Sequence, residues 1–257
     1  MVSIKNKKEI ELMRNVCKIV AKTYDELEKY IKPGISTYEL DIIAEKLMRE
    51  QGVIPAEKGY STGMKGMPAY PASTCISVND EVIHAIPSKK KILKEGDIVS
   101  VDTVALKDGF HGDAARTFIV GKPNSEEDIR LVEVTKQAFF EGIKLAKPGN
   151  RVGDISNCIG EYVKSKGYSV LKEFQGHGIG RQMHEDPGIP NYGKAGRGIR
   201  LEEGMTLAIE PMVIAGKSDI IELGDGWTIA SKDGTMTAHY ENTILITKNE
   251  PEILTLI

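Results

Sequence analysis

The sequence predicts an α/β protein built from two halves of similar plan. Each half begins with a helical spacing of apolar residues and continues into short apolar runs that are typical of strands. A turn motif recurs, because Pro33-Gly34 returns 115 residues later as Pro148-Gly149. The 257 residues allow one large domain or two small ones. We expect a single catalytic domain over residues 1–257, with repeat halves at about 10–120 and 125–250.

Three helices follow from local patterns. The first is amphipathic and ends before Lys32-Pro33-Gly34, as indicated by apolar residues at helical spacing: Ile10, Met13, Val16, Cys17, Val20 and Leu27. Ser36 or Thr37 can cap the second helix, expected over residues 38–52 (YELDIIAEKLMREQG). A corresponding helical pattern in the second half covers residues 154–166 (DISNCIGEYVKSK).

Strands and loops fill the intervals. A Gly-, Pro- and Tyr-rich loop is expected over residues 59–71. Short apolar runs that are typical of strands follow it, TCISV at 74–78 and DIVSVDTVAL at 97–106. The stretch over residues 215–226 (AGKSDIIELGDG) is expected to be a surface loop.

Two matched pairs of strand motifs carry carboxylates. EGDIVSVD ends on Asp102 and is matched by EGMTLAIE, which ends on Glu210, so each of these strands is expected to end on an acid. TFIVGK, just after Asp113, is matched by TILITK, just after Glu241. One such similarity would be attributed to chance. Three similarities in the same order favour a repeat.

If the two halves face each other, these four carboxylates converge from four strands on one central site. Burial and mutual repulsion would then raise their pKa values and make the metal-free site unfavourable. Two divalent cations about 3.5–4 Å apart, such as Mn, Fe, Co or Zn, would resolve that repulsion. A single acid is usually a solvated strand end. Asp102 and Glu210, however, follow apolar runs that should be buried.

The five histidines differ in their surroundings. His177 lies in FQGHGIG, where glycines on both sides permit close backbone approach, so it is the predicted metal ligand. His184 follows in QMHEDP, near enough to line the same cavity, and His84 in EVIHAIP can face the site from the opposite half. His111 and His239 are interpreted as structural residues.

Composition excludes several classes of protein. Lys and Arg total 34 against 37 Asp and Glu, a formal net charge of −3, which argues against nucleic acid as the main partner. Three widely separated cysteines argue against a disulfide framework and against a cysteine-built zinc site. The N-terminal stretch lacks the apolar core of a signal peptide, and no run has the length of a membrane span. We therefore expect a cytoplasmic protein without a membrane partner.

The motifs as a group resemble those of one enzyme family. VDTVALKDGFHGDAARTF, GHGIGRQMHEDP, EGMTLAIEP and DGWTIASKDGTMTAHYENTILIT are similar to the motifs of type I methionine aminopeptidases over essentially the whole chain. The resemblance implies the α/β pita-bread fold, whose pseudo-twofold symmetry agrees with the internal repeat. It also implies two divalent metal cations, Co, Mn, Fe or Zn, bridged by Asp113 and Glu241. The implied ligand set is Asp102, Asp113, His177, Glu210 and Glu241.

The activity implied by the resemblance is removal of the initiator methionine from nascent proteins with a small second residue. The partner would be a nascent chain near the ribosome, and the enzyme a monomer. A metal-bridging hydroxide would attack the first peptide bond, and Glu210 would shuttle its proton. His184 would hydrogen-bond the carbonyl as it becomes an oxyanion, and His84 would lie near the leaving nitrogen. The free amino terminus would bind near the metal held by Asp102.

The methionine pocket is also implied by the resemblance. Trp227, Tyr70 and Cys75 match substrate-binding positions of the family, although a tryptophan alone would be interpreted as core packing. Three positions around the pocket that often hold Cys, Tyr and Phe in enterobacterial members are thioethers here, which keeps the pocket apolar but adaptable: Met64, Met67 and Met183.

Three other functions remain open. Prolidases and proline-specific aminopeptidases use similar ligands but normally carry an extra N-terminal domain. His111 and Asp113, with His177 or His184, resemble the facial triad of a non-haem iron oxygenase, which leaves the other three carboxylates unexplained. A catalytically silent peptide-binding protein would be expected to have lost ligands. Peptide hydrolysis, oxygen consumption or binding alone would separate these functions.

Overall fold

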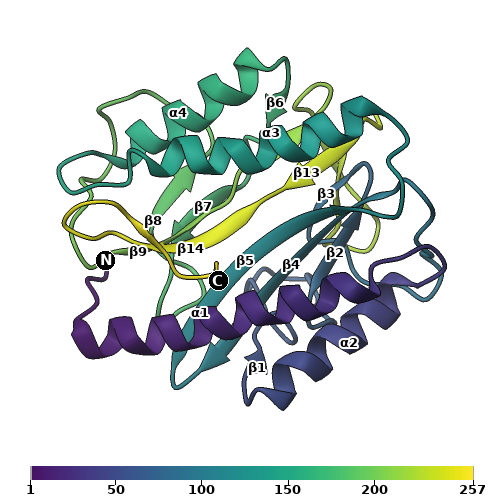
Figure 1. Cartoon of the computed structure of the whole chain (residues 1–257), viewed down its shortest axis with the longest axis horizontal. Helices are drawn as coiled ribbons and strands as arrows, with labels where there is room; N and C mark the ends of the chain where they lie inside the picture. The colour runs from purple at the N-terminus through teal and green to yellow at the C-terminus, as the bar shows by residue number, and fades with distance from the viewer. Residues whose placement is uncertain (1, 257) are drawn as a thin grey trace.

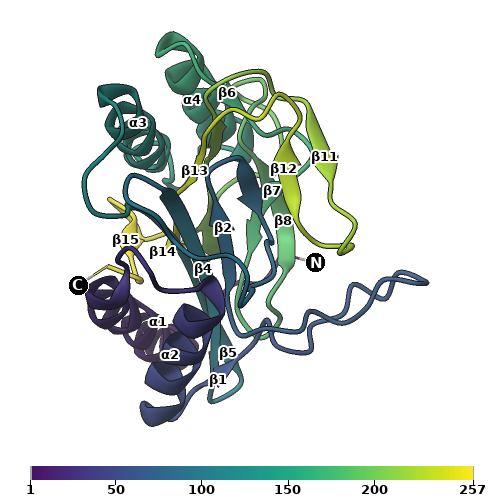
Figure 2. The same cartoon turned by 90° about the vertical axis from the view of Figure 1, so that its right-hand side faces the viewer.

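The computed structural model describes residues 2–256. Helices lie on one side of a large antiparallel sheet, as α1, α2 and α3 show in Figure 2. One 3-10 turn, Glu28–Tyr30, continues the first helix. Within the described residues, no helix is both long and apolar enough to span a bilayer. The helices are α1 (Lys7–Leu27), α2 (Thr37–Glu50), α3 (Glu126–Ile143) and α4 (Val152–Ser165).

Side-chain caps fix where the first two helices begin. The Asn6 side chain accepts hydrogen bonds from the first turn of α1, and the Glu9 carboxylate accepts from the Asn6 N–H at 2.9 Å. Ser36 and Glu39 form the same capping box at α2. The expected helices are therefore confirmed, and Ser36 rather than Thr37 is the cap.

The strands form one main sheet and two small ones (Figure 1). Strands of the main sheet are β1 (Ile54–Pro55), β2 (Cys75–Val78), β4 (Ile98–Lys107), β5 (Phe110–Ile119), β7 (Gln175–Gly178), β8 (Glu185–Pro190), β9 (Thr206–Ile209), β14 (Glu241–Leu245) and β15 (Glu252–Ile253). Their order is β1-β4-β5-β14-β9-β7-β8, with β2 paired to β4 and β15 to β14. The small sheets contain β3 (Glu81–Ile83), β6 (Ser169–Val170), β10 (Met212–Ile214), β11 (Ile220–Glu222), β12 (Ile229–Ser231) and β13 (Thr237–His239).

Two expectations about strands are wrong. Asp102 does not end its strand, because β4 continues to Lys107 and pairs with β5 over its whole length, from Ile98 opposite Ile119 to Lys107 opposite Phe110. The stretch over 215–226 is not only a loop, because it contains β11, which pairs with β12. Pairing with the next strand along the chain decided both outcomes, and the pattern within one apolar run does not contain that information.

Two hydrophobic cores lie beneath the two helix pairs. One core joins α1 and α2 to β2, β4 and β5, and the other joins α3 and α4 to strands that include β9 and β10. The two halves also turn alike, since Gly34 and Gly149 have φ of +94° and +95°. The N–H of Gly34 donates to Leu93 O, and that of Gly149 donates to Leu201 O. The same turn therefore precedes α2 and α4.

A buried tyrosine ties α1 to the sheet. The Tyr24 hydroxyl donates to Ala114 O at 2.6 Å and lies 3.0 Å from Val101 O. We predict that Tyr24→Phe lowers the free energy of unfolding by about 1–3 kcal/mol, because buried acceptors lose their donor. Urea unfolding followed by circular dichroism measures this. Tyr30→Phe, at a residue that is 42% exposed, is the matched control and should leave stability unchanged. Equal stability of both variants would contradict the prediction.

Candidate active site

The five predicted ligand residues lie on five consecutive neighbours of the main sheet. Asp102 is on β4, Asp113 on β5 and Glu241 at the start of β14. Glu210 directly follows β9, and His177 is on β7. These strands are adjacent in the order β4-β5-β14-β9-β7. At about 4.8 Å per step these five strands span about 19 Å, so the side chains must converge from their strands to form one cluster.

The atoms of this cluster are close enough to share a cation. Ligand atoms of Asp113, His177 and Glu241 lie within 4.8 Å of one another. Nε2 of His177 is 3.7 Å from Asp113 Oδ2 and 3.7 Å from Glu210 Oε1. Burial lowers the pKa of His177 to about 3, so its ring is neutral and these contacts are not ion pairs. The group can therefore hold a divalent metal ion.

Glycines and a carbonyl orient His177. A Cβ at Gly176 would lie 2.4 Å from Ala208 O, and one at Gly178 would lie 2.2 Å from Asp186 O. Only glycine therefore permits the neighbouring backbone to approach this closely on both sides of His177, as expected. Nδ1 of His177 lies 2.9 Å from Gly178 O, which can only accept. Nδ1 must therefore carry the proton, and the Nε2 lone pair faces the carboxylates.

In the part of the chain that the structure describes, no Lys or Arg forms an ion pair with these carboxylates, although the charge of Arg116 acts on Glu241. Burial is the main cause that raises the pKa of Asp102 to about 7 and the pKa values of Asp113, Glu210 and Glu241 well above their usual range. Mutual repulsion adds to the shift for the last three. Among residues 2–256, no partner reaches one buried oxygen each of Asp102, Asp113 and Glu241. Buried carboxylate oxygens without hydrogen-bond partners are suitable ligands for a divalent cation.

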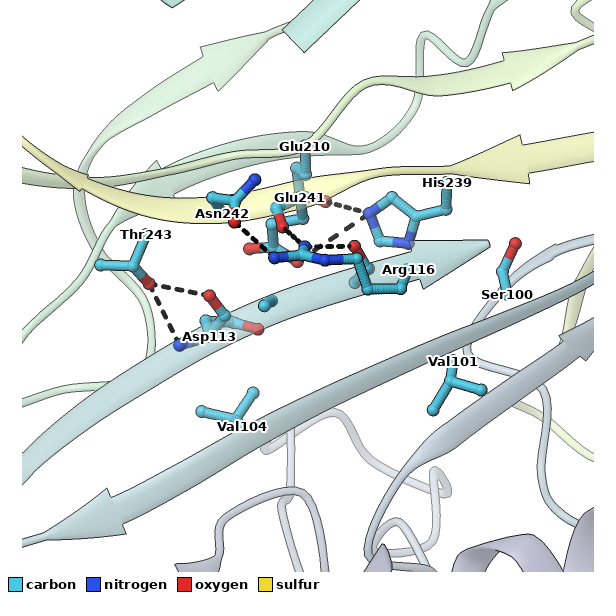
Figure 3. A network of polar contacts seen from close by, with 12 residues as sticks. Ser100, Val101, Val104, Asp113, Arg116, Glu210, His239, Glu241, Asn242 and Thr243 are labelled. Carbon is cyan, nitrogen blue, oxygen red and sulfur yellow. Dashed lines mark hydrogen bonds and ion pairs between the residues drawn. The ribbon is translucent and has the colours of Figure 1, made fainter. Parts of the chain in front are cut away.

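Two side chains brace the cluster through the backbone (Figure 3). Arg116 donates to the backbone oxygen of Glu241 and, at 2.6 Å, to Asn242 Oδ1. The Thr243 hydroxyl donates to Asp113 O at 2.9 Å and accepts from Asp113 N at 3.1 Å. Arg116 therefore positions the Glu241 segment without bonding to its carboxylate.

His239 lies closer to the cluster than its sequence position indicated. Its Nε2 is 3.9 Å from both Glu210 Oε2 and Glu241 Oε2, as Figure 3 shows. This buried nitrogen has no hydrogen-bond partner among the described residues. β13 ends at His239 and β14 begins at Glu241, in a different sheet. Spacing along one regular strand therefore could not predict its position.

A cavity opens beside the carboxylates, and the predicted substrate-binding residues line it: His84, His184, Tyr70, Cys75 and Trp227. The Tyr70 and Trp227 rings lie edge to face with centroids 5.1 Å apart. The Tyr70 hydroxyl donates to Ala85 O at 2.9 Å, so it serves the fold. Burial keeps the Cys75 thiol neutral by raising its pKa well above the usual value. This wall of the cavity is apolar.

The two pocket histidines are neutral. Burial lowers the pKa of His84 to about 4, and desolvation lowers that of His184, although this side chain retains solvent exposure. The His184 ring is 4.4 Å from that of His177. Its Nδ1 lies 3.0 Å from the Tyr60 hydroxyl. The pocket thus contains neutral imidazoles next to the acidic cluster.

Comparison with known proteins assigns the chain to a family. Metallopeptidase family M24 matches residues 11–248. The chain belongs to this family. A methionine aminopeptidase of Clostridium acetobutylicum is 52% identical over 256 residues, covering 100% of this chain and 99% of that protein.

Solved structures agree with the M24 assignment. The crystal structure of methionine aminopeptidase from Thermotoga maritima is similar with a TM-score of 0.95 and 47% identity, covering 100% of both chains. This likeness confirms the expected α/β pita-bread fold. Prolidase from Pyrococcus furiosus is less similar, with a TM-score of 0.77 and 27% identity over 99% of this chain and 65% of that chain.

The three methionines expected around the pocket of this M24 chain are not equivalent. Met183 lines the cavity. Met67 packs against the aromatic cluster without lining the cavity, and Met64 is 68% exposed. Left-handed turns at Gly63 and Gly66 flank Met64 in the loop between them. The expectation is thus wrong for Met64, whereas Met67 lies behind the aromatic wall of the pocket.

Sequence reasoning also missed pocket residues. Glu57, Tyr60 and Phe174 line the same cavity. No spacing marked them, because each lies outside the strands that carry the ligands. In the sequence Glu57 is followed by Lys and Gly, a pattern typical of an exposed turn, but the structure buries this side chain.

Metal dependence of stability follows from the repulsion among the acids. We predict that Asp113→Asn leaves the metal-free protein at least as stable as wild type, because one buried charge is removed. Mn²⁺ at 100 times its dissociation constant should stabilise wild type by about 2.7 kcal/mol. The variant should lose most of this gain. Thermal unfolding with and without Mn²⁺ measures both effects.

The matched control is Asp108→Asn. This residue is in the turn between β4 and β5, and its positive φ of 51° suits asparagine. It should show the full response to Mn²⁺. A wild-type response in Asp113→Asn would contradict the assigned cluster.

Proposed function

We propose that this chain is a metal-dependent aminopeptidase that removes the N-terminal methionine of polypeptides. The row of one ligand side chain on each of five neighbouring strands, beside an apolar pocket, carries the proposal. Similarity to methionine aminopeptidases over the full chain supports it. The substrate is the free N-terminus of a nascent chain with a small second residue.

The cofactors are two divalent cations. Asp102, Asp113, His177, Glu210 and Glu241 would hold them. Co, Mn, Fe and Zn all suit this mixture of carboxylate and imidazole. Bound cations supply Lewis acidity, which lowers the pKa of water from about 15.7 towards about 7 and polarises a carbonyl. The unpartnered oxygens in the cluster support this assignment.

Three side chains handle protons and the developing charge. Glu210 accepts a proton from the attacking water and returns it. With the Tyr60 hydroxyl donating to Nδ1, the neutral His184 ring carries its proton on Nε2 and donates to the scissile carbonyl. His84, which is neutral and lines the same cavity, would lie near the leaving nitrogen.

The aromatic wall selects the side chain of the first residue. Trp227, Tyr70 and Cys75 present apolar surface to the methionine side chain. Trp227 is held by a hydrogen bond from Nε1 to Pro68 O at 3.1 Å. A fixed apolar wall favours an uncharged, unbranched side chain over a charged one.

Residues 1–257 act as one catalytic domain, with repeat halves at about 10–120 and 125–250. Two cores of similar construction and the matched turns before α2 and α4 support this division. The enzyme works in the cytoplasm as a monomer, on chains emerging near the ribosome, without nucleic acid as its main ligand.

The proposal is tested by release of methionine from Met-Ala-Ser and acetyl-Met-Ala-Ser. We expect cleavage of the unblocked peptide only, after Mn²⁺ or Co²⁺ is returned to metal-stripped protein. Glu210→Ala should abolish it. Chromatographic detection of free methionine measures the reaction. No release with any metal bound to folded protein would contradict the proposal and favour a peptide-binding protein. Cleavage of Xaa-Pro peptides instead would favour a prolidase.

The role of His184 gives a second prediction. We predict that His184→Ala lowers kcat by about 100- to 1,000-fold, as for loss of an oxyanion donor. Bound metal per chain should not change, because His184 lies outside the ligand set. Steady-state kinetics with metal analysis measures both quantities. A wild-type kcat, or loss of metal, would contradict the assigned role.

A further inference from the structure

Glu57 is a carboxylate of the pocket that lies outside the ligand set. It follows β1, which is paired with the edge of β4. The backbone ladder between these strands ends where the Ala56 N–H donates to Val104 O at 2.8 Å. The Glu57 side chain then continues the ladder, because its Oε1 accepts from the Val104 N–H at 2.8 Å. The carboxylate is thus placed by the sheet.

This placement brings Glu57 to the border between the acidic cluster and the apolar wall. Val104 is opposite Asp113 in the pairing of β4 with β5, and two residues from Asp102. The charge of Glu57 contributes to the raised pKa of Cys75 on the apolar wall. Glu57 therefore lines the cavity together with residues of both regions.

The second oxygen of Glu57 has no partner. Oε2 is buried and receives no hydrogen bond from residues 2–256. Within the described chain, no Lys or Arg is among the residues that line the cavity. Burial, with Asp102 and Asp113 nearby, raises the pKa of Glu57 well above its usual range. A buried carboxylate oxygen of this kind is costly unless a donor reaches it.

The substrate of an aminopeptidase brings a suitable donor. Its α-amino group has a pKa of about 7.7–8.0, and the cations of the site favour its neutral form, which keeps a lone pair for the metal held by Asp102 and offers two N–H donors. One N–H would satisfy Oε2 with a hydrogen bond to the charged carboxylate and would favour the ionised form of Glu57. An acetylated N-terminus offers only one N–H and no basic lone pair.

We propose that Glu57 binds the α-amino group of the first substrate residue through Oε2 and so contributes to selection of free N-termini. The inference rests on the proposed function, because it assumes a peptide N-terminus in this pocket. Two other roles are possible outcomes of a test. Glu57 could be a further metal ligand, or only a structural extension of the β1–β4 ladder.

Glu57→Gln separates these roles. The amide oxygen can still accept from Val104 N–H, so the ladder is kept, while an NH₂ donor replaces Oε2. The probes are methionine and γ-methylthiobutyrate, which is methionine without its amino group. Calorimetry with Mn²⁺-loaded protein measures both affinities. We expect methionine to bind about 10- to 100-fold more weakly to the variant, as for loss of a hydrogen bond to a charged group. The affinity for γ-methylthiobutyrate should not change.

Glu45→Gln is the matched control. Its carboxylate bonds to Lys58, Arg49 and Ser73 and does not line the cavity. Both probe affinities should equal those of wild type. Circular dichroism and bound Mn²⁺ per chain verify that each variant is folded and loaded.

Two results would overturn the inference. Equal weakening of both probes with less bound Mn²⁺ would identify a metal ligand, and unchanged affinities would identify a purely structural residue. Each result is distinct from failure of the proposed function, which is judged by whether loaded wild type releases methionine from Met-Ala-Ser. Wild-type cleavage with unchanged amine preference in Glu57→Gln would reject the inference alone.

Discussion

Repulsion among buried carboxylates is the constraint on which the arrangement of this molecule depends. Four acids and one histidine come to one place, and burial raises the pKa of each acid. The fold withstands this because the acids sit on paired strands whose backbone hydrogen bonds do not involve the carboxylates. Arg116 and Thr243 add bonds to the backbone beside Glu241 and Asp113. The stability of the paired strands therefore offsets the repulsion among the carboxylates, and this repulsion favours the binding of cations.

Chemistry and selectivity come from different parts of the structure. The ligands are on or directly beside the strands of the main sheet, where the strand order makes them neighbours, and the helices pack on the side shown in Figure 2. Most pocket residues come from segments around the sheet, including the loop after β1 and the segments next to β3 and β12, whereas Cys75 is on β2. Glu57 joins these two parts, since its carboxylate accepts a hydrogen bond from the backbone of β4. A change in these segments can thus alter selection while the sheet holds the ligands.

Local sequence predicted the elements well where local interactions decide them. The helix over Thr37–Glu50 follows from the Ser36 capping box and an amphipathic spacing, both of which lie within a few residues. Strand ends were predicted less well, because the end of β4 depends on β5 and the existence of β11 depends on β12. Met64 was misplaced because it lies in a loop with left-handed glycines at 63 and 66, where its side chain is exposed.

The sequence by itself determined three of the four α-helices in the described chain (α3 was not predicted), the internal repeat, the apolar strands that carry acids and the family motifs, because each depends on neighbouring residues. Only the tertiary structure decided that β4, β5, β14, β9 and β7 are consecutive, which turns five distant residues into one cluster. It also decided that His239 and Glu57 are at the site. Both lie there because strand pairing brings together segments far apart in the chain, and no spacing along one strand records which strands will pair.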